Sequence, residues 1–322
     1  MIGKTQDEIT KKWPKNYDKP LVSIRCLTYN HEPYIAQTLD GFLMQETDFP
    51  FEVVVHDDAS TDFTAEIIRK YAIKYPKIIK PIYETENQYS KRNGSIRKIM
   101  NSACKGKYIA YCEGDDYWTY SFKLQEQVDL LEKKSEISLI HTNFETVDEF
   151  GSKIKRQSYN GFDSLSIKED GLVSLFKKNH IMTLSVVLRK EVLFSVHYEK
   201  CPYRYDYALF FAAAFCGKIK YIPQKMGAYR KHSTSLMQTK STIVNKKLEK
   251  VYFYYADYFL NTKATLPYKD VISIIFSVMT HAVIWKNFQF LIKMIIKKPS
   301  SLSMFPFVIC FVFFRRFIEK KG

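Results

Sequence analysis

The feature that most constrains the fold is a short apolar run that ends in two neighbouring aspartates, and this pattern occurs twice. Residues 51–56 lead into Asp57-Asp58, and residues 107–112 lead into Glu113-Gly114-Asp115-Asp116. Each apolar run predicts a buried strand. A single acidic pair is commonly a solvated turn. Two pairs at the ends of strands predict one ligand-binding edge, because open α/β sheets bind ligands beyond the carboxyl ends of their strands.

The rest of the chain alternates in the same way. Further strands are predicted over 21–27, 78–83, 137–143, 183–188 and 218–222, and helices over 34–44, 63–75, 95–104, 122–133, 172–178 and 205–216. Strands that alternate with helices predict an α/β fold with a mostly parallel central sheet and right-handed crossovers. We divide the chain into an N-terminal arm (1–19), an α/β domain (20–240) and a helical C-terminal region (241–322).

Composition narrows the choice of partners. The 322 residues hold 49 Lys and Arg against 34 Asp and Glu, a formal charge of +15, which favours anionic lipid head groups or phosphorylated substrates. Nucleic acid is not expected, because no recognised motif or basic stripe with interleaved aromatic residues accompanies the charge. The six scattered cysteines fit reduced thiols, and the polar N-terminus does not resemble a secretory signal peptide, so we expect a cytoplasmic protein.

The C-terminal region is apolar and basic. An amphipathic stretch (243–262) precedes apolar runs at 271–296 and 302–314, and the last of these is shorter than the roughly 20 residues that a membrane-spanning helix needs. Apolar helices with basic flanks suit an anionic membrane surface. The alternative is that these helices pack on the α/β domain or on a second subunit. We expect peripheral attachment at the inner face of the cell membrane.

The acidic pair at 115–116 raises the question of a counter-charge. Adjacent carboxylates repel each other, and a divalent cation with oxygen ligands is the usual solution, which indicates Mg²⁺ or Mn²⁺. Such a cation could in turn bind a diphosphate.

Together these motifs resemble a known family. The segment 21–32, the segment Asp57-Asp58-Ala59-Ser60-Thr61-Asp62, and the segment from Gly106 to Trp118 occur in the order and spacing of a family-2 glycosyltransferase. The resemblance covers roughly residues 20–235. It implies the GT-A fold, a nucleotide-sugar donor, a DxD-like metal motif and transfer of the sugar with inversion, as in bacterial polysaccharide synthesis.

The resemblance also assigns roles on the donor side. It places Thr28, Asn30 and Glu32 at the nucleotide base and ribose, although Asn30 could equally form the turn. It places Asp57 and Asp58 against uracil and ribose, with helix capping as the alternative for one of the pair and as the expected role of Asp62. Arg97 would face the diphosphate, and a solvent-exposed helix arginine is the other interpretation.

The remaining roles concern metal, sugar and chemistry. The resemblance implies that Asp116 coordinates the metal. It implies that Asp115 contacts the ribose or the metal, and that His232 contacts the diphosphate or the metal. Trp118 would pack beside a sugar, or else anchor the core. Asp206 matches the catalytic base, although the family often has two acids there and this chain has Tyr205 before Asp206. An acid favoured by the helix dipole is the alternative.

These inferences predict an inverting, metal-dependent glycosyltransferase with a UDP-linked donor. Its acceptor would be a glycan, with a polyprenyl-linked glycan of capsule or O-antigen assembly as the expected form. A non-catalytic nucleotide-sugar-binding scaffold of the same fold is the alternative, and loss of Asp116 or Asp206 would have favoured it.

Overall fold

The structure is a computed structural model that describes residues 3–154, 171–235, 241–262 and 268–284, together with 266, 287 and 290. Eight strands form one sheet in the order β3-β2-β1-β4-β7-β6-β8-β5. They are β1 (Val22–Thr28), β2 (Phe51–Asp57), β3 (Ile79–Tyr83), β4 (Tyr108–Tyr111), β5 (Tyr117–Trp118), β6 (Ile137–Val147), β7 (Val187–Arg189) and β8 (Lys218–Arg230).

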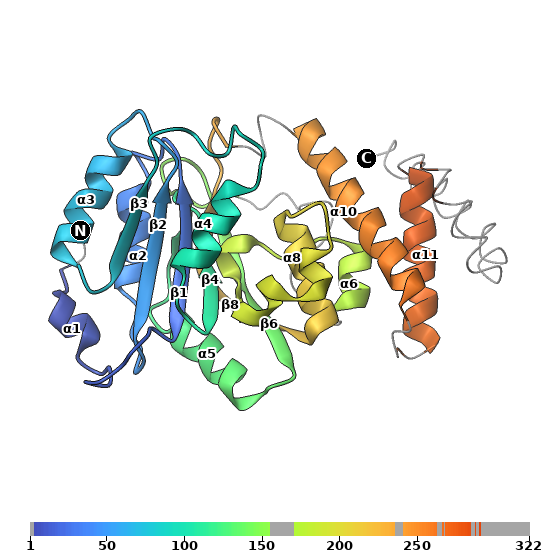
Figure 1. Cartoon of the computed structure of the whole chain (residues 1–322), viewed down its shortest axis with the longest axis horizontal. Helices are drawn as coiled ribbons and strands as arrows, with labels where there is room; N and C mark the ends of the chain where they lie inside the picture. Colours follow the sequence, from blue (N-terminus) through green and yellow to red (C-terminus); the bar gives the residue numbers. More distant parts are fainter. Residues whose placement is uncertain are drawn as a thin grey trace.

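Helices cover the sheet and build the far end of the molecule. The α-helices are α1 (Gln6–Thr10), α2 (Ile35–Leu43), α3 (Thr64–Lys74), α4 (Ser95–Ala103), α5 (Lys123–Lys133), α6 (Leu172–Lys177), α7 (Val196–Glu199), α8 (Asp206–Cys216), α10 (Ser241–Asn261) and α11 (Tyr268–Ile284). Two short 3-10 helices, η3 (Thr183–Ser185) and η4 (Lys190–Phe194), flank β7. Figure 1 shows β3, β2, β1 and β4 in one half of the molecule and α6, α8, α10 and α11 in the other.

The parallel part of the sheet positions the acidic motifs. Strand β1 pairs in parallel with both β2 and β4, and Thr28 at the end of β1 lies opposite Asp57 at the end of β2. Because β1, β2 and β4 run in the same direction, their carboxyl ends share one edge of the sheet. The prediction that both acidic pairs follow strands at one edge is therefore confirmed.

Beyond β4 the sheet is mixed. Strand β7 is antiparallel to β4 and β6, and β5 is antiparallel to β8, whereas β6 and β8 are parallel. The α/β class and the mostly parallel first half agree with the prediction. Two local predictions were wrong: residues 183–185 form η3 before β7 begins, and β8 extends to Arg230, so that part of the expected basic turn is strand.

The described C-terminal helices pack on the rest of the chain. The Tyr255 ring of α10 stacks on Phe211 of α8 with centroids 4.8 Å apart. The hydroxyls of Tyr252 and Ser277 donate to the carbonyl of Phe176 in α6. Among the described residues, no helix combines the length and the apolar character needed to span a membrane. The predicted apolar run 302–314 and most of its basic flanks lie outside the described residues.

Candidate active site

Asp57 and Asp58 end β2 and have different surroundings. Asp57 is buried and accepts hydrogen bonds from the hydroxyl and backbone N–H of Ser60. Burial raises the pKa of Asp57 above its ordinary value. The carboxylate of Asp58 accepts from the backbone N–H groups of Gln88 and Tyr89 at 2.7 and 3.0 Å. Asp58 therefore fixes the loop after β3 at the edge of the site.

Asn30 and Glu32 hold two loops together. Asn30 has a positive φ of 54°, which asparagine tolerates better than most residues, and its Oδ1 accepts from the backbone N–H of Thr61 at 2.8 Å. Glu32 accepts from the backbone N–H of Phe63 and donates its own N–H to Asp62. Turn formation, the alternative for Asn30, is what the structure shows, and the Glu32 carboxylate is likewise engaged in loop contacts. Asp62 also accepts from the first backbone N–H of α3, as expected.

The acidic turn that follows β4 presses closely against the end of β1. A Cβ added to Gly114 would lie 2.7 Å from Thr28 Oγ1 and 2.9 Å from His31 Nδ1, so only glycine fits there. Both of these polar atoms are buried without a hydrogen-bond partner among the described residues. Buried polar atoms usually find a partner, so the pair indicates a place for water or a ligand. Thr28 thus lies where the resemblance predicted.

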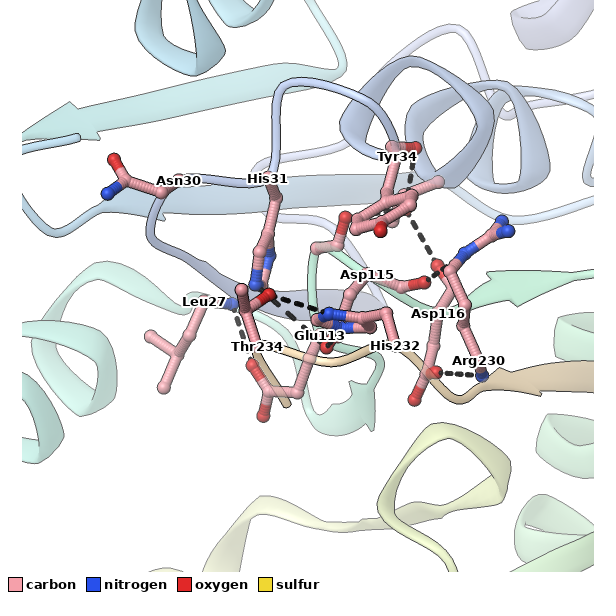
Figure 2. A network of polar contacts seen from close by, with 12 residues as sticks. Leu27, Asn30, His31, Tyr34, Glu113, Asp115, Asp116, Arg230, His232 and Thr234 are labelled. Atoms are coloured by element: carbon pink, nitrogen blue, oxygen red, sulfur yellow. Dashed lines mark hydrogen bonds and ion pairs between the residues drawn. The ribbon is translucent and has the colours of Figure 1, made fainter. Parts of the chain in front are cut away.

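Asp115 is the centre of the network in Figure 2. Its Oδ2 lies 3.0 Å from His232 Nε2 and 3.9 Å from His31 Nε2. Burial alone would raise the pKa of Asp115, but the hydrogen bond with His232 and the charges of the two imidazoles hold it below its ordinary value. The ring of Tyr34 packs on His232 with centroids 4.9 Å apart. Part of the stabilisation predicted for the acidic pair thus comes from the hydrogen bond between His232 and Asp115.

Asp116 is buried beside the end of β8. The backbone N–H of Arg230 donates to Asp116 Oδ1 at 2.8 Å. The backbone carbonyl of Asp116 accepts from the hydroxyl of Thr38. Desolvation, reinforced by the neighbouring Asp115 charge, raises the pKa of Asp116 well above its ordinary value. The two adjacent acids therefore differ: Asp115 is stabilised as a carboxylate and Asp116 holds a proton more readily.

Arg230 connects four parts of the site. Its guanidinium donates to the carbonyls of Asp115 and Glu149 and to the side chain of Gln37, and it lies over the rings of Tyr34 and Tyr117. No role was predicted for Arg230 from the sequence. The signal that could have found it is its position two residues before His232.

Glu113 is a second residue for which the sequence analysis gave no role. It is half-buried, and its Oε2 accepts from the backbone N–H of Leu27 at 3.1 Å. Desolvation, together with the charge of Asp206, raises the pKa of Glu113 to about 8, although Arg25 opposes this rise. The charge of Asp206 thus acts on the acidic turn although more than 90 residues of sequence separate them.

Asp206 is the first residue of α8 and keeps solvent-exposed surface. Its Oδ2 accepts from the hydroxyl of Thr183 at 3.2 Å. Desolvation raises the pKa of Asp206 above its ordinary value, although the Thr183 hydrogen bond and the charge of Arg25 oppose this rise. A general base needs a carboxylate that is both accessible and more basic than usual. The alternative interpretation, an acid favoured by the helix dipole, predicts only that Asp206 lies at the start of a helix. This position is observed as well.

Two predicted site residues remain, Trp118 and Arg97. Trp118 is 1% exposed, donates through Nε1 to the carbonyl of Leu184 at 2.9 Å, and packs edge-on against Phe42. A ring buried in this way offers no face to a sugar, so the core-anchor interpretation of Trp118 replaces the sugar contact. Arg97 is half-buried on α4, and its charge acts on Tyr198. No contact in the structure joins it to the acidic turn within the described ranges.

The donor atoms suit a divalent cation only in part. Carboxylate and imidazole are ligands that Mn²⁺ accepts. Within the described part of the chain, no three His, Cys, Asp or Glu side chains are grouped as a ready metal site. Cations that act with substrate phosphates often use only one or two protein carboxylates, so Asp116, with one oxygen engaged by Arg230, fits such a partial site. Both ring nitrogens of His232 are engaged, by Asp115 and Thr234, so His232 would have to exchange one of these contacts for the cation.

The comparisons with known proteins agree with this fold. The family model "Glycosyl transferase family 2" matches residues 23–197, and the chain belongs to that family. The uncharacterized protein Rv1520 of Mycobacterium tuberculosis is 37% identical over 225 residues, which cover 69% of this chain and 62% of that protein. The chain thus spans about three fifths of that relative's length.

Other matches have functional names. An Escherichia coli UDP-Glc:alpha-D-GlcNAc-diphosphoundecaprenol beta-1,3-glucosyltransferase, WfaP, is 37% identical over 112 residues, 35% of this chain and 41% of WfaP. Staphylococcus aureus TarS 1–349 with UDP-GlcNAc has a TM-score of 0.60 at 19% identity, covering 81% of this chain and 72% of that one. The Pyrobaculum calidifontis mannosyltransferase PcManGT with GDP-Man and Mn²⁺ has a TM-score of 0.50 at 16% identity, covering 92% and 88%. These structures share the GT-A fold.

Proposed function

We propose that this chain is an inverting glycosyltransferase that moves a sugar from a UDP-linked donor to a glycan acceptor. The features that carry the proposal are an accessible carboxylate, Asp206, and an acidic turn at the carboxyl ends of β1, β2 and β4 on which the Asp206 charge acts. A site for sugar transfer needs both a base for the acceptor and a charged edge for the nucleotide diphosphate.

The reaction would be a single displacement. The acceptor hydroxyl oxygen attacks C1 of the donor sugar while the bond from C1 to the phosphate oxygen breaks on the opposite face. The hydroxyl proton passes to Asp206, and the nucleoside diphosphate leaves with the bonding electrons. The raised pKa of Asp206 helps it to take this proton.

The residues proposed to bind the donor are assigned from their positions at the ends of the strands. Thr28 and Asp57 lie at adjacent strand ends, where their oxygens can accept from, or in the case of Thr28 also donate to, a base and ribose. Asp58 acts by fixing the loop that borders this edge. UDP is the proposed nucleotide because the names of WfaP and of the TarS complex both carry it.

We further propose a dependence on Mn²⁺ or Mg²⁺. Asp116 and His232 are the residues that would hold the cation, and Asp115 would contact the ribose or support His232. When bound, the cation would neutralise charge on the departing diphosphate. The complex of PcManGT with GDP-Man and Mn²⁺ supports this part of the proposal.

The acceptor is proposed to be lipid-linked, and the protein to act at the cytoplasmic face of the membrane. The acceptor named for WfaP is alpha-D-GlcNAc-diphosphoundecaprenol, a sugar on a lipid diphosphate, and TuaG of Bacillus subtilis, 32% identical over 119 residues, is named as a putative teichuronic acid biosynthesis glycosyltransferase. The formal charge of +15 suits an anionic membrane surface. Cell-surface polysaccharide assembly is therefore the proposed context.

The experiment that tests the proposal measures donor hydrolysis and thermal shift. The full chain is incubated with UDP-, GDP-, dTDP- and CMP-sugars, each with Mn²⁺ and with EDTA. We expect one UDP-sugar to stabilise the protein and to be slowly hydrolysed, in Mn²⁺ only. If all four nucleotide classes leave both the melting temperature and the donor unchanged, the catalytic proposal is wrong.

A further inference from the structure

A hollow of about 340 Å³ lies between residues 202–203 and one face of α10. Both aromatic and polar side chains line it, among them Tyr203, Glu249, Lys250, Phe253, Tyr254 and Asp257, and Asn287 and Phe290 complete the lining. None of the predicted site residues lines it. Aromatic faces beside carboxylate and ammonium groups provide both a stacking surface and hydrogen-bond partners for hydroxyls, which is the chemistry that a sugar ring requires.

The hollow lies next to the proposed base. Tyr203 precedes Asp206 by three residues, so their Cα atoms are at most about 11 Å apart. Two contacts keep this segment against α10: Lys250 lies over the Tyr203 ring at 5.9 Å and Lys247 over the Tyr205 ring at 4.8 Å. Residues 247, 250 and 254 share one face of the helix. One face of α10 therefore runs from beside the base to the hollow.

The same face of α10 also reaches the donor side. Lys247 lies 6.0 Å from the ring of Tyr89, whose backbone N–H is held by Asp58. Lys247 is half-buried and makes no ion pair within the described ranges. This helix thus borders the loop fixed by Asp58, the base and the hollow, and Figure 1 shows it lying along α8.

We propose that the hollow is an acceptor subsite that binds a second sugar unit of the glycan, one unit removed from the attacking hydroxyl. This inference rests on the proposed function, because it requires Asp206 to receive an acceptor hydroxyl. The terminal sugar lies at Asp206, and the next sugar stacks on Tyr203 and Tyr254 while the carboxylates of Glu249 and Asp257 accept hydrogen bonds from its hydroxyls. The enzyme then prefers acceptors of two or more sugars over monosaccharides.

The test uses saccharides as probes. Binding of cellobiose, lactose, chitobiose and N-acetyllactosamine, and of the matching monosaccharides, is measured by saturation-transfer NMR on the full chain saturated with donor nucleotide. We expect at least one disaccharide to bind roughly tenfold more tightly than its monosaccharide, the gain that one stacked ring provides. Tyr203→Ala should abolish this difference, and Tyr203→Phe should keep it. Tyr268→Ala, at an 80% exposed position on α11, is the matched control.

Two outcomes overturn the inference. If no disaccharide binds better than its monosaccharide, or if the preference survives in both Tyr203→Ala and Tyr254→Ala, the hollow is not an acceptor subsite. Thermal shift with the UDP-sugar separates this failure from failure of the proposed function. A wrong subsite leaves the donor response of the wild-type chain intact, whereas a wrong function removes it. The same measurement verifies that each variant is folded.

Discussion

His232 Nε2 lies 3.0 Å from Asp115 Oδ2, so the segment that follows β8 is joined directly to the acidic turn that follows β4. The other ring nitrogen, Nδ1, lies 2.8 Å from Thr234 Oγ1, which fixes the orientation of the imidazole. Because His232 is buried, this contact holds the two segments together at the proposed diphosphate position.

Replacing His232 should weaken metal-dependent donor binding. His232→Ala removes both the proposed metal ligand and the partner of Asp115, and we expect the Kd of the UDP-sugar in Mn²⁺ to rise by about 10- to 100-fold. Calorimetric titration with and without Mn²⁺ checks this. Ser233→Ala, at the adjacent exposed position, is the control. An unchanged Kd in His232→Ala would remove this residue from the site.

Asp206→Asn should abolish transfer and leave donor binding intact. The amide cannot accept the acceptor proton, so kcat should fall by about 10²- to 10⁴-fold. Initial rates with the identified donor measure kcat, and titration measures donor affinity. Glu199→Gln, at a nearby exposed acid, should behave as wild type. Full turnover in Asp206→Asn would mean that another group is the base.

The same carboxylate sets the acid side of the pH–rate profile. Desolvation raises the pKa of Asp206, and only its ionised form can act as a base. The rate should therefore decline, as pH falls, at a higher pH than an ordinary aspartate would give. A profile of kcat/KM for the acceptor across the acid and neutral pH range shows this limb. A flat profile through the acid range contradicts the assignment.

Asp58→Ala should raise the KM for the donor with a smaller change in kcat. The substitution leaves the backbone N–H groups of Gln88 and Tyr89 without their carboxylate partner, so the loop bordering the site loses its fixed position. Asp58→Asn keeps one acceptor oxygen and should have a milder effect. Glu86→Gln, which removes only a surface ion pair with Lys91, is the control. Equal KM values in all three variants would refute the positioning role.

Trp118→Ala should act on stability. Loss of a fully buried indole typically lowers the free energy of unfolding by about 3–5 kcal/mol, and here the carbonyl of Leu184 also loses its donor. Urea unfolding measures this loss, and Trp118→Phe should lose less. If the Ala variant instead unfolds like wild type and loses only sugar binding, Trp118 belongs at the donor after all.

Lys123 provides a test of stability against pH. It is fully buried, contacts Gln127 Oε1 at 2.6 Å, and desolvation lowers its pKa to about 7. The unfolded chain therefore binds more protons between about pH 7 and the ordinary lysine pKa of about 10.4, so the contribution of this group to stability rises with pH across that window. Relative to wild type, the Lys123→Met variant should therefore gain the most unfolding free energy at pH 7, and this gain should shrink toward pH 10. A difference independent of pH would mean that Lys123 is not desolvated.

Local patterns in the sequence determined much of this protein. Apolar runs and turn residues predicted the strands that end at Asp57 and at the acidic turn, and the helix predicted over 205–216 is observed as α8 from Asp206. These features depend on the periodicity of neighbouring residues and on the common direction of parallel strands, both of which a single chain reveals.

Only the tertiary structure decided which polar groups meet. The partners of Asp58 lie 30 and 31 residues later in the chain, His232 meets Asp115 across 117 residues, and Arg230 connects the site through its side chain. The burial of Trp118 depends on Phe42 and Leu184, which come from other elements. Such contacts follow from how strands and helices pack in three dimensions, and the local sequence around each residue carries no record of the distant partner.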